Sequence, residues 1–224
     1  MLQAIHLTAM TLSKELIKQI DKAAEIVRKG GVVAFPTDTV YGLGASPFIA
    51  EAVKRIYKIK QRPANLPLPV LLADESQVDT IAAGIPEMAR SLMKAFWPGG
   101  LTLVLSRAHS FPGGAAAGGD TVAVRVPDYE ITRLLIRKAG VPVIGTSANI
   151  SSRPSALEAG EVSRQLGDVI DMIIDGGRCP GGIESTVVDL TGGSPVIVRE
   201  GAVSADKITE IIEEVTEGAY SSGQ

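Results

Sequence analysis

Hydrophobic positions along the chain alternate between segments with a helical period and short apolar runs typical of strands. The spacing of Leu16, Ile20, Ala24 and Val27 predicts an amphipathic helix over residues 12–29. Similar patterns predict helices around 53–60 and at about 86–96, 129–139, 156–166 and 205–215. Strands are predicted at 32–35, 67–72, 101–105, 121–126, 141–146, 169–174, 185–190 and 194–199.

Two local signals mark the ends of predicted elements. Ser155-x-x-Glu158 has the form of a capping box and predicts a helix that begins directly after Ser155. Gly192 and Gly193 separate the last two strands at the length of a hairpin loop, so these strands are predicted to pair with each other.

The order of the elements predicts one domain. No linker-like stretch and no internal repeat divides the 224 residues. Because βα units alternate with hairpins, the sheet is predicted to be mixed, and not doubly wound and parallel. We therefore expect a single α/β domain over residues 1–216, with helices flanking a mixed sheet, and a flexible C-terminal tail over residues 217–224.

Charge and composition exclude several classes of protein. Lys and Arg number 22 against 25 Asp and Glu, and the net charge of −3 argues against a protein that coats nucleic acid. A local cationic pocket for a small anion remains compatible with this charge. One Cys and two His exclude a disulfide scaffold and an all-protein zinc site, and they weaken any Cys-His or Ser-His mechanism. Without a signal-like leader or an apolar run of about 20 residues, we expect a cytoplasmic protein that does not span a membrane.

Common nucleotide-binding motifs are missing from the chain. The P-loop pattern G-x-x-x-x-G-K-[ST] does not occur, and Gly42-x-Gly44 continues to Pro47 where a dinucleotide fingerprint needs a third glycine. The nucleophile elbow G-x-S-x-G is also missing. Any nucleotide site must therefore be built from other residues.

Polar residues follow the first predicted strand. Thr37, Asp38 and Thr39 lie in a tight turn at the strand end, where α/β sheets commonly bind ligands. An ordinary turn, in which these side chains satisfy the local backbone, also explains them. Arg125 interrupts an apolar strand, so we expect either a protein carboxylate or a ligand as its partner.

Two further segments carry groups suited to anions. Lys58, Lys60 and Arg62 lie at a predicted helix end, where they either neutralise the helix C-terminus or clamp phosphate oxygens. Their position predicts exposed cations whose loss leaves the fold intact. Residues 145–149 place small hydroxyls and an amide directly after a strand, which suits phosphate or ribose. Ser155 fits a helix N-cap, a role that does not exclude an anion at the same helix N-terminus.

Six motifs in fixed order resemble those of the YrdC family of threonylcarbamoyl-AMP synthases. They are P-T-[DE]-T-V-Y-G-L-G, K-x-R-P, W-P-G-x-[LV]-T, D-[ST]-[VL]-A-V-R, [TP]-S-A-N and S-T-V-[VI]-D, between about residues 31 and 201. The resemblance implies a twisted α/β sheet around a large positively charged cavity, in a short form without the extra C-terminal domain of longer members.

The same resemblance implies the activity. ATP, L-threonine and bicarbonate would react to give L-threonylcarbamoyl adenylate and pyrophosphate, with Mg²⁺ arriving on the nucleotide. The product would serve the formation of threonylcarbamoyladenosine in tRNA. This makes tRNA and a downstream threonylcarbamoyl transferase further expected partners.

The resemblance also assigns roles to individual residues. Thr37 and Arg125 would bind L-threonine, with Arg125 pairing its carboxylate, and Lys60 and Arg62 would act in catalysis. The residues expected to bind ATP are Arg62, Thr121, Ser147, Asn149, Ser155 and Arg199. No metal site made by protein side chains is expected.

The chain departs from the family pattern after its K-x-R-P motif. Leu66 and Leu71 fill positions that are Asn and His in many members, where one residue contacts ATP and the other threonine. A paralogous branch of the family lacks the K-x-R and S-x-N motifs, and both are present here. This favours the synthase over the alternative, a non-catalytic RNA- or nucleotide-binding member.

Overall fold

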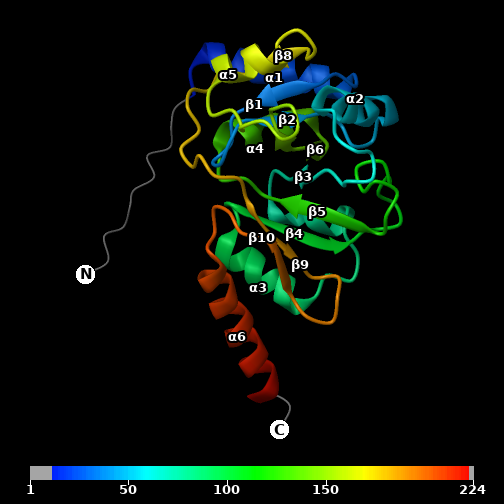
Figure 1. Cartoon of the computed structure of the whole chain (residues 1–224), viewed down its shortest axis with the longest axis vertical. Helices are drawn as coiled ribbons and strands as arrows, with labels where there is room; N and C mark the ends of the chain where they lie inside the picture. The colour runs from blue at the N-terminus through cyan, green and yellow to red at the C-terminus, as the bar shows by residue number, and fades with distance from the viewer. Residues whose placement is uncertain (1–11, 222–224) are drawn as a thin grey trace, which may run out of the picture.

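Two mixed β-sheets flanked by helices make up residues 12–221, the part of the chain that the computed structural model describes (Figure 1). Four short strands form one sheet in the order β7-β2-β1-β8: β1 (Val33–Phe35), β2 (Gly42–Gly44), β7 (Thr146–Ser147) and β8 (Met172–Ile173). Six strands form the other in the order β10-β9-β4-β5-β3-β6: β3 (Val70–Leu71), β4 (Leu101–Ser106), β5 (Thr121–Arg125), β6 (Val143–Ile144), β9 (Thr186–Asp189) and β10 (Val196–Arg199). Both sheets contain parallel and antiparallel neighbours, which confirms the predicted α/β class with mixed pairing.

The predicted helices are present, with shifts at their ends. They are α1 (Lys14–Arg28), α2 (Ala50–Lys60), α3 (Glu87–Phe96), α4 (Glu130–Ala139), α5 (Ala159–Leu166) and α6 (Ala205–Ser221). A 3₁₀ helix, η1 (Glu75–Thr80), was not predicted. Because α6 continues past residue 215, the first part of the expected tail is helical, and residues 222–224 lie outside the described residues. No helix within residues 12–221 is both long enough and apolar enough to cross a membrane.

The strand predicted at 141–146 divides between the two sheets. Its first part, β6, pairs with β3 in the six-stranded sheet, and its last residues form β7, which pairs with β2 in the four-stranded sheet. The expectation of one sheet is therefore wrong. The hydrophobic pattern reads as one strand because a change of pairing partner at Gly145 does not alter which residues are apolar.

Two glycines let the sheets approach closely at this junction. A Cβ atom on Gly44 would lie 2.2 Å from the carbonyl oxygen of Ile144, and one on Gly145 would lie 2.2 Å from Cγ of Leu71. The backbone N–H of Ile144 also donates to the carbonyl oxygen of Ala45 at 2.9 Å. A larger residue at position 44 would meet a backbone carbonyl, and one at position 145 would overlap the Leu71 side chain.

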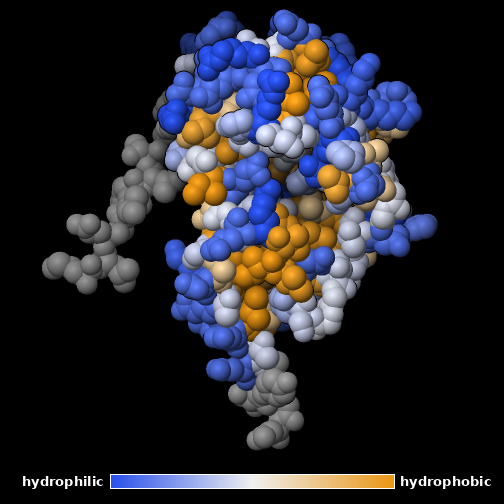
Figure 2. All heavy atoms as spheres, viewed as in Figure 1, coloured by the Kyte–Doolittle hydropathy of each residue, from blue (hydrophilic) through white to orange (hydrophobic). Residues whose placement is uncertain are grey.

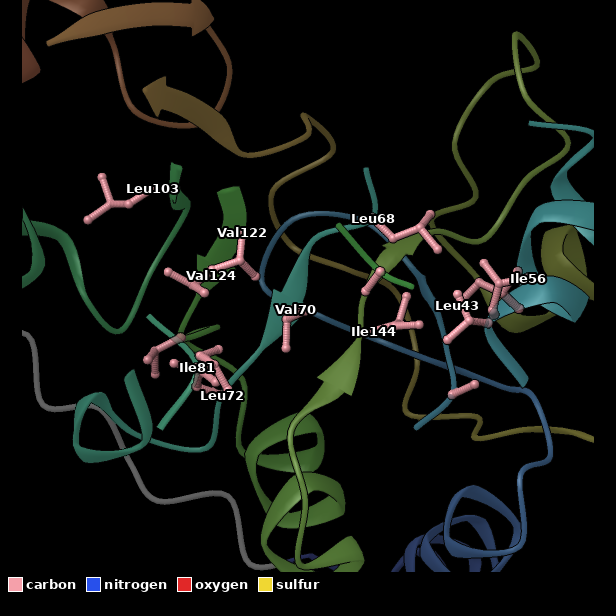
Figure 3. Close-up of a cluster of buried hydrophobic side chains, with 14 of the residues drawn as sticks. Leu43, Ile56, Leu68, Val70, Leu72, Ile81, Leu103, Val122, Val124 and Ile144 are labelled. Atoms are coloured by element: carbon pink, nitrogen blue, oxygen red, sulfur yellow. The ribbon is translucent and has the colours of Figure 1, made fainter. Parts of the chain in front are cut away.

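A continuous hydrophobic core connects the sheets. Figure 3 shows it extending from Leu43 and Ile56 through Val70 and Ile144 to Leu103, and all five side chains are buried. A second cluster lies where α1 packs against α4 and the four-stranded sheet. The core therefore fixes the sheets against each other on one side of their junction.

The last two strands form the predicted hairpin, and their outer face is apolar. β9 and β10 pair antiparallel. Val196 and Val198 of the edge strand β10 are 56% and 62% exposed. Figure 2 shows hydrophobic side chains gathered over this part of the molecule. Pairing with β9, and not burial of its own valines, holds β10 in place.

Replacing Gly44 by Ala should lower the free energy of unfolding by about 1–3 kcal/mol, because the added Cβ meets a backbone carbonyl that cannot rotate away. Urea unfolding of the variant and the wild type measures the difference. Gly193→Ala is the matched control, since nothing lies within 4 Å of its Cβ position, and its unfolding free energy should stay within about 0.5 kcal/mol of the wild type. Equal stability of the two variants would show that the sheets are not packed this closely.

Candidate active site

A cavity of about 810 Å³ lies where the two sheets meet, and residues from both sheets line it. Its basic lining residues are Lys60, Arg62, Arg125, Arg153 and Arg199, and its acidic lining residue is Glu184. The predicted site residues on the lining are Lys60, Arg62, Arg125, Ser147, Asn149 and Arg199. Thr37, Thr121 and Ser155 are not part of the lining. The structure thus brings most, but not all, of the predicted site together.

Arg125 lies on the face of β5 opposite the core and is buried. Its Nη2 donates to Asp38 Oδ1 at 2.5 Å, its Nη1 to Thr39 Oγ1 at 2.9 Å, and its Nε to the carbonyl oxygen of Gly99 at 2.8 Å. Burial lowers the pKa of Arg125, and the neighbouring Asp38 carboxylate opposes that shift. The expected carboxylate partner is therefore Asp38. Gly99 explains why the W-P-G motif belongs to the site, since its carbonyl supports the guanidinium.

Thr37 lies beneath this arrangement and not on the cavity surface. Its hydroxyl donates to the carbonyl oxygen of Val40 at 2.7 Å and lies 2.9 Å from Thr39 Oγ1. Because the hydroxyl hydrogen of Thr37 is used by Val40, the Thr39 hydroxyl donates to Thr37 and accepts from Arg125. The turn interpretation thus fits Thr37, whereas Thr39 and Asp38, which received no site role from the sequence, contact Arg125 directly.

Lys60 is the last residue of α2 and is 2% exposed, so the expectation of an exposed cation is wrong. Its Nζ donates to the carbonyl oxygens of Ser147 and Asn149 and to Asn149 Oδ1, the latter two at 3.0 Å. Burial, and to a lesser extent the charge of Arg62, lower the pKa of Lys60 to about 8, while Glu184 opposes this shift. Exposure could not be judged from the sequence because the three acceptors lie almost 90 residues away.

The end of α2 directs the three cations to different places. Gln61 adopts the left-handed conformation with φ 51°, and the N–H of Arg62 bonds to the carbonyl oxygen of Tyr57 at 3.1 Å. Lys58, on the helix itself, is exposed and outside the cavity lining. Arg62 reaches the cavity edge, where Nη2 donates to the carbonyl oxygen of Pro67 at 3.1 Å. Lys60 and Arg62 therefore line the cavity, whereas Lys58 does not.

Ser147 and Asn149 line the cavity on the segment that receives Lys60. The Asn149 amide oxygen accepts from Lys60, and its Nδ2 donates to the carbonyl oxygen of Arg153. The oxygen and the nitrogen of the Asn149 amide both make hydrogen bonds that stabilise the loop after β7. Ser151 Oγ, also on the lining, is buried with no hydrogen-bond partner among the described residues.

The predicted capping box at Ser155 does not form, and this expectation is wrong. α5 begins at Ala159 and not directly after Ser155, and its N-cap residue, Glu158, makes no side-chain capping bond. The Ser155 hydroxyl donates instead to Glu184 Oε1 at 2.8 Å. An acceptor 29 residues away replaces the local one, and this could not be read from the motif.

Arg199, at the end of β10, holds the segment before β9. Its Nη1 donates to Glu184 Oε2 at 2.5 Å, and its Nε and Nη2 donate to the carbonyl oxygen of Ser185 at 3.1 and 2.8 Å. Ser185 Oγ in turn lies 2.8 Å from Thr102 Oγ1 on β4. Glu184, Ser185 and Thr102 all line the cavity, and none of them was predicted.

Three other residues singled out in the sequence have distinct positions. Thr121 begins β5 and lies four positions before Arg125, about 13 Å along a strand. It therefore lies away from the cavity lining. Leu66 and Leu71, at the positions that are Asn and His in many family members, both line the cavity and make parts of its wall apolar.

Among the described residues the cysteine thiol is not activated as a nucleophile, and no metal cluster is formed. Burial raises the pKa of Cys179 to about 11, so its thiolate is scarce at neutral pH. Within residues 12–221 no group of three or more His, Cys, Asp or Glu side chains is placed to hold a metal ion. The site is therefore one of positioned cations, hydroxyls and backbone groups.

Comparison with known families identifies the family to which the chain belongs. The family model Sua5/YciO/YrdC, described as Telomere recombination, matches residues 25–201. The chain belongs to the Sua5/YciO/YrdC family. The matched segment includes every residue on the cavity lining, from Thr39 to Arg199. The family resemblance seen in the motifs is thereby confirmed.

Members of the Sua5/YciO/YrdC family named threonylcarbamoyl-AMP synthase are similar to this chain. The Pyrococcus abyssi (strain GE5 / Orsay) protein is 46% identical over 193 residues, which cover 86% of this chain and 57% of that protein. The Bacillus subtilis (strain 168) protein is 44% identical over 195 residues, covering 87% and 56%. The chain thus spans little more than half the length of these two curated relatives. A Halorhodospira halophila (strain DSM 244 / SL1) protein of the same name is 35% identical over 84% of this chain and 92% of its own length.

A solved structure of the family has the same fold. The crystal structure of P. abyssi Sua5 complexed with L-threonine matches with a TM-score of 0.84 and 46% identity. The match covers 86% of this chain and 57% of that one. The fold of this Sua5/YciO/YrdC member is therefore supported by an experimental relative over most of its length.

The lowered pKa of Lys60 predicts how stability changes in alkaline solution. Below about pH 8 Lys60 is charged in both states, so the folded protein bears the cost of burying the charge. As pH rises above about 8, the folded protein releases this proton while the unfolded chain keeps it up to about 10.5, so the free energy of unfolding rises. Relative to Lys60→Met, the wild type should gain about 2 kcal/mol between about pH 8 and pH 10.

Urea unfolding of the wild type and Lys60→Met across this pH range measures the gain, because other titrating groups cancel in the difference. The Met side chain keeps the length of the lysine but carries no charge. Parallel pH profiles for the two proteins would contradict the burial of a charged Lys60.

Proposed function

We propose that this protein is an L-threonylcarbamoyladenylate synthase, a nucleotidyltransferase that converts ATP, L-threonine and bicarbonate into L-threonylcarbamoyl adenylate and pyrophosphate. The observation that carries the proposal is the convergence of five basic side chains on one cavity, in a chain 46% identical to a synthase. The substrates are a triphosphate, a bicarbonate and an amino-acid carboxylate, whose charge the basic lining matches. The same excess of basic groups supports the expectation of a positively charged cavity. The similarity to a short synthase supports the activity in a chain of this length.

L-Threonine would bind at Arg125. Three of the five N–H groups of its guanidinium donate to Asp38, Thr39 and Gly99, which leaves two for a substrate carboxylate. The P. abyssi relative is complexed with L-threonine, which supports threonine as the ligand, and the two remaining N–H groups support Arg125 as its partner. Thr37 would act through Thr39, since it accepts the Thr39 hydroxyl hydrogen and so turns that oxygen toward Arg125.

The ATP phosphates would lie against Lys60, Arg62 and Arg199, with Ser147 and Asn149 beside them. Arg62 can fork across two phosphate oxygens, whereas Lys60 acts as a compact charge. Mg²⁺ would arrive with the nucleotide, held by phosphate oxygens and water. Ser155 and Thr121 would be further ATP contacts, as the family motifs imply, although both lie outside the cavity lining. Ser155 is one hydrogen bond from the lining, through Glu184.

The chemistry proceeds without a protein nucleophile. The amine of L-threonine attacks the carbon of bicarbonate, and water leaves as the carbamate forms. A carbamate oxygen then attacks the α-phosphorus of ATP, and pyrophosphate departs. Both steps depend on orientation and on stabilisation of negative charge, which Lys60 and Arg62 would supply at the phosphates.

The chemistry of the proposed product indicates which partners the protein would need. An acyl adenylate is reactive, so a threonylcarbamoyl transferase that acts on tRNA is expected to consume it. We therefore propose a cytoplasmic protein that works beside such a transferase and its tRNA.

The proposal predicts that purified protein, ATP, L-threonine and bicarbonate release pyrophosphate and form L-threonylcarbamoyl adenylate. A coupled pyrophosphate assay and mass spectrometry of the product measure this. One methyl group in a pocket is worth a preference of about 10- to 200-fold, so L-serine should react more slowly by that factor. Threonine amide, without a carboxylate for Arg125, should not react. A chain that releases no pyrophosphate is not a synthase, and equal rates with threonine amide would contradict the role of Arg125.

The K-x-R segment provides a test by substitution. Arg62→Ala should lower turnover about 10²- to 10³-fold, because a charge-assisted contact to the developing phosphate charge is lost. Lys58→Ala is the matched control, exposed on the same helix and outside the cavity, and it should stay within a few-fold of the wild type. Lys60→Ala is less informative, because it also removes three hydrogen bonds that hold the segment after β7. Similar turnover of Arg62→Ala and Lys58→Ala would mean that Arg62 does not contact the phosphates.

A further inference from the structure

Glu184 is the acidic residue on a cavity lining that otherwise carries basic charge, and both of its carboxylate oxygens are engaged. Oε1 accepts from the Ser155 hydroxyl at 2.8 Å, and Oε2 accepts from Arg199 Nη1 at 2.5 Å. Its charge also reaches Lys60, whose pKa it raises. Three of the groups that the proposed function assigns to ATP therefore face this one carboxylate.

The backbone that carries Glu184 is fixed. Its carbonyl oxygen accepts from the N–H of Ala202 at 2.8 Å. A Cβ on Gly201 would lie 2.2 Å from that oxygen, so the two chain segments are in close contact. Arg199 also donates a hydrogen bond to the carbonyl oxygen of the next residue, Ser185. The Glu184 side chain, which is 36% exposed, is consequently the part that can move.

The two bonds of Glu184 connect separate parts of the fold across the cavity. Ser155 belongs to the segment between β7 of the four-stranded sheet and α5, whereas Arg199 ends β10 at the edge of the six-stranded sheet. Figure 1 shows α5 and β10 in different halves of the molecule. A phosphate group that binds Arg199 and Ser155 must take the place of this carboxylate.

We propose that Glu184 is an internal anion that occupies Ser155 and Arg199 before nucleotide binds and competes with the phosphates of ATP for them. This rests on the proposed function for the identity of the ligand. Entry of a triphosphate brings like charges together, so Glu184 must leave both partners. Glu184 thereby weakens nucleotide binding and helps pyrophosphate to leave, because its carboxylate returns to the same groups. Glu184 therefore acts on nucleotide affinity and on product release, and it is not a group that reacts.

Replacement of the carboxylate tests this. Glu184→Gln keeps the size of the side chain and removes its charge, and it should tighten binding of a non-hydrolysable ATP analogue about tenfold, by isothermal titration calorimetry at fixed salt. Glu184→Asp keeps the charge and should bind within about threefold of the wild type. Glu158→Gln is the matched control, since Glu158 pairs with Arg178 in an exposed ion pair outside the cavity lining, and it should leave binding unchanged. Urea unfolding checks that all three variants are folded.

The remaining outcomes separate this inference from the proposed function. Each titration is repeated with and without Mg²⁺ and with inorganic tripolyphosphate. If Glu184→Gln binds more weakly only when Mg²⁺ is present, Glu184 is a metal ligand and the internal-anion proposal fails. If its binding is unchanged, or weaker with and without Mg²⁺, the proposal fails as well. If the protein makes no L-threonylcarbamoyl adenylate but Glu184→Gln still tightens tripolyphosphate, the synthase fails and the internal anion stands. Failure of the wild type and Glu184→Gln to bind any of these polyphosphates would overturn both.

Discussion

The buried ion pair between Arg125 and Asp38 is the interaction on which the site depends. Arg125 belongs to β5 in the six-stranded sheet, and Asp38 follows β1 in the four-stranded sheet, so the pair joins the two sheets beside their junction. A guanidinium that is removed from water needs its charge compensated, and breaking such a pair typically costs about 3–5 kcal/mol. The bonds that Arg125 donates to Thr39 and Gly99 fix the guanidinium orientation that the carboxylate alone would leave free. The sheets are therefore held together by a charged contact on the cavity side and by apolar packing on the other.

Lys60 meets the same requirement in a different way. Its acceptors are two backbone carbonyls and one amide oxygen, which satisfy its three donors without neutralising its charge. The pKa of Lys60 is lowered because these neutral acceptors compensate only part of the cost of burying its charge. Arg125 and Arg199 form ion pairs with carboxylates, whereas Lys60 forms none among the described residues. Glu184 raises the pKa of Lys60 without pairing with it, so the positive charge of Lys60 is compensated only in part. An anionic substrate gains more from such a group than from a cation already paired.

Features fixed by local pattern could be predicted from the sequence, and features fixed by distant contacts could not. The helical period places α1 and α4 within about two residues of their observed ends, because each buries one face of a continuous helix. Most of the site residues chosen from the motifs line one cavity. Burial of Lys60 and the bond of Ser155 to Glu184 were missed, because their partners lie far away in the sequence. The division into two sheets was missed as well, since Gly145 changes the pairing without changing the hydrophobic pattern.

The cations of the cavity differ in how firmly they are held, and this difference has a mechanistic consequence. Lys60 and Arg125 are buried and bound by several groups, so they are already in position and lose little conformational freedom when a substrate arrives. Arg62 instead bonds to the carbonyls of Leu66 and Pro67 on an exposed segment, through contacts that are long or solvent-accessible. It can leave them at small cost, because bonds of this kind contribute little to stability. In the proposed reaction, the rigid cations would position the substrates, whereas the Arg62 guanidinium would change partners as negative charge develops on the departing pyrophosphate.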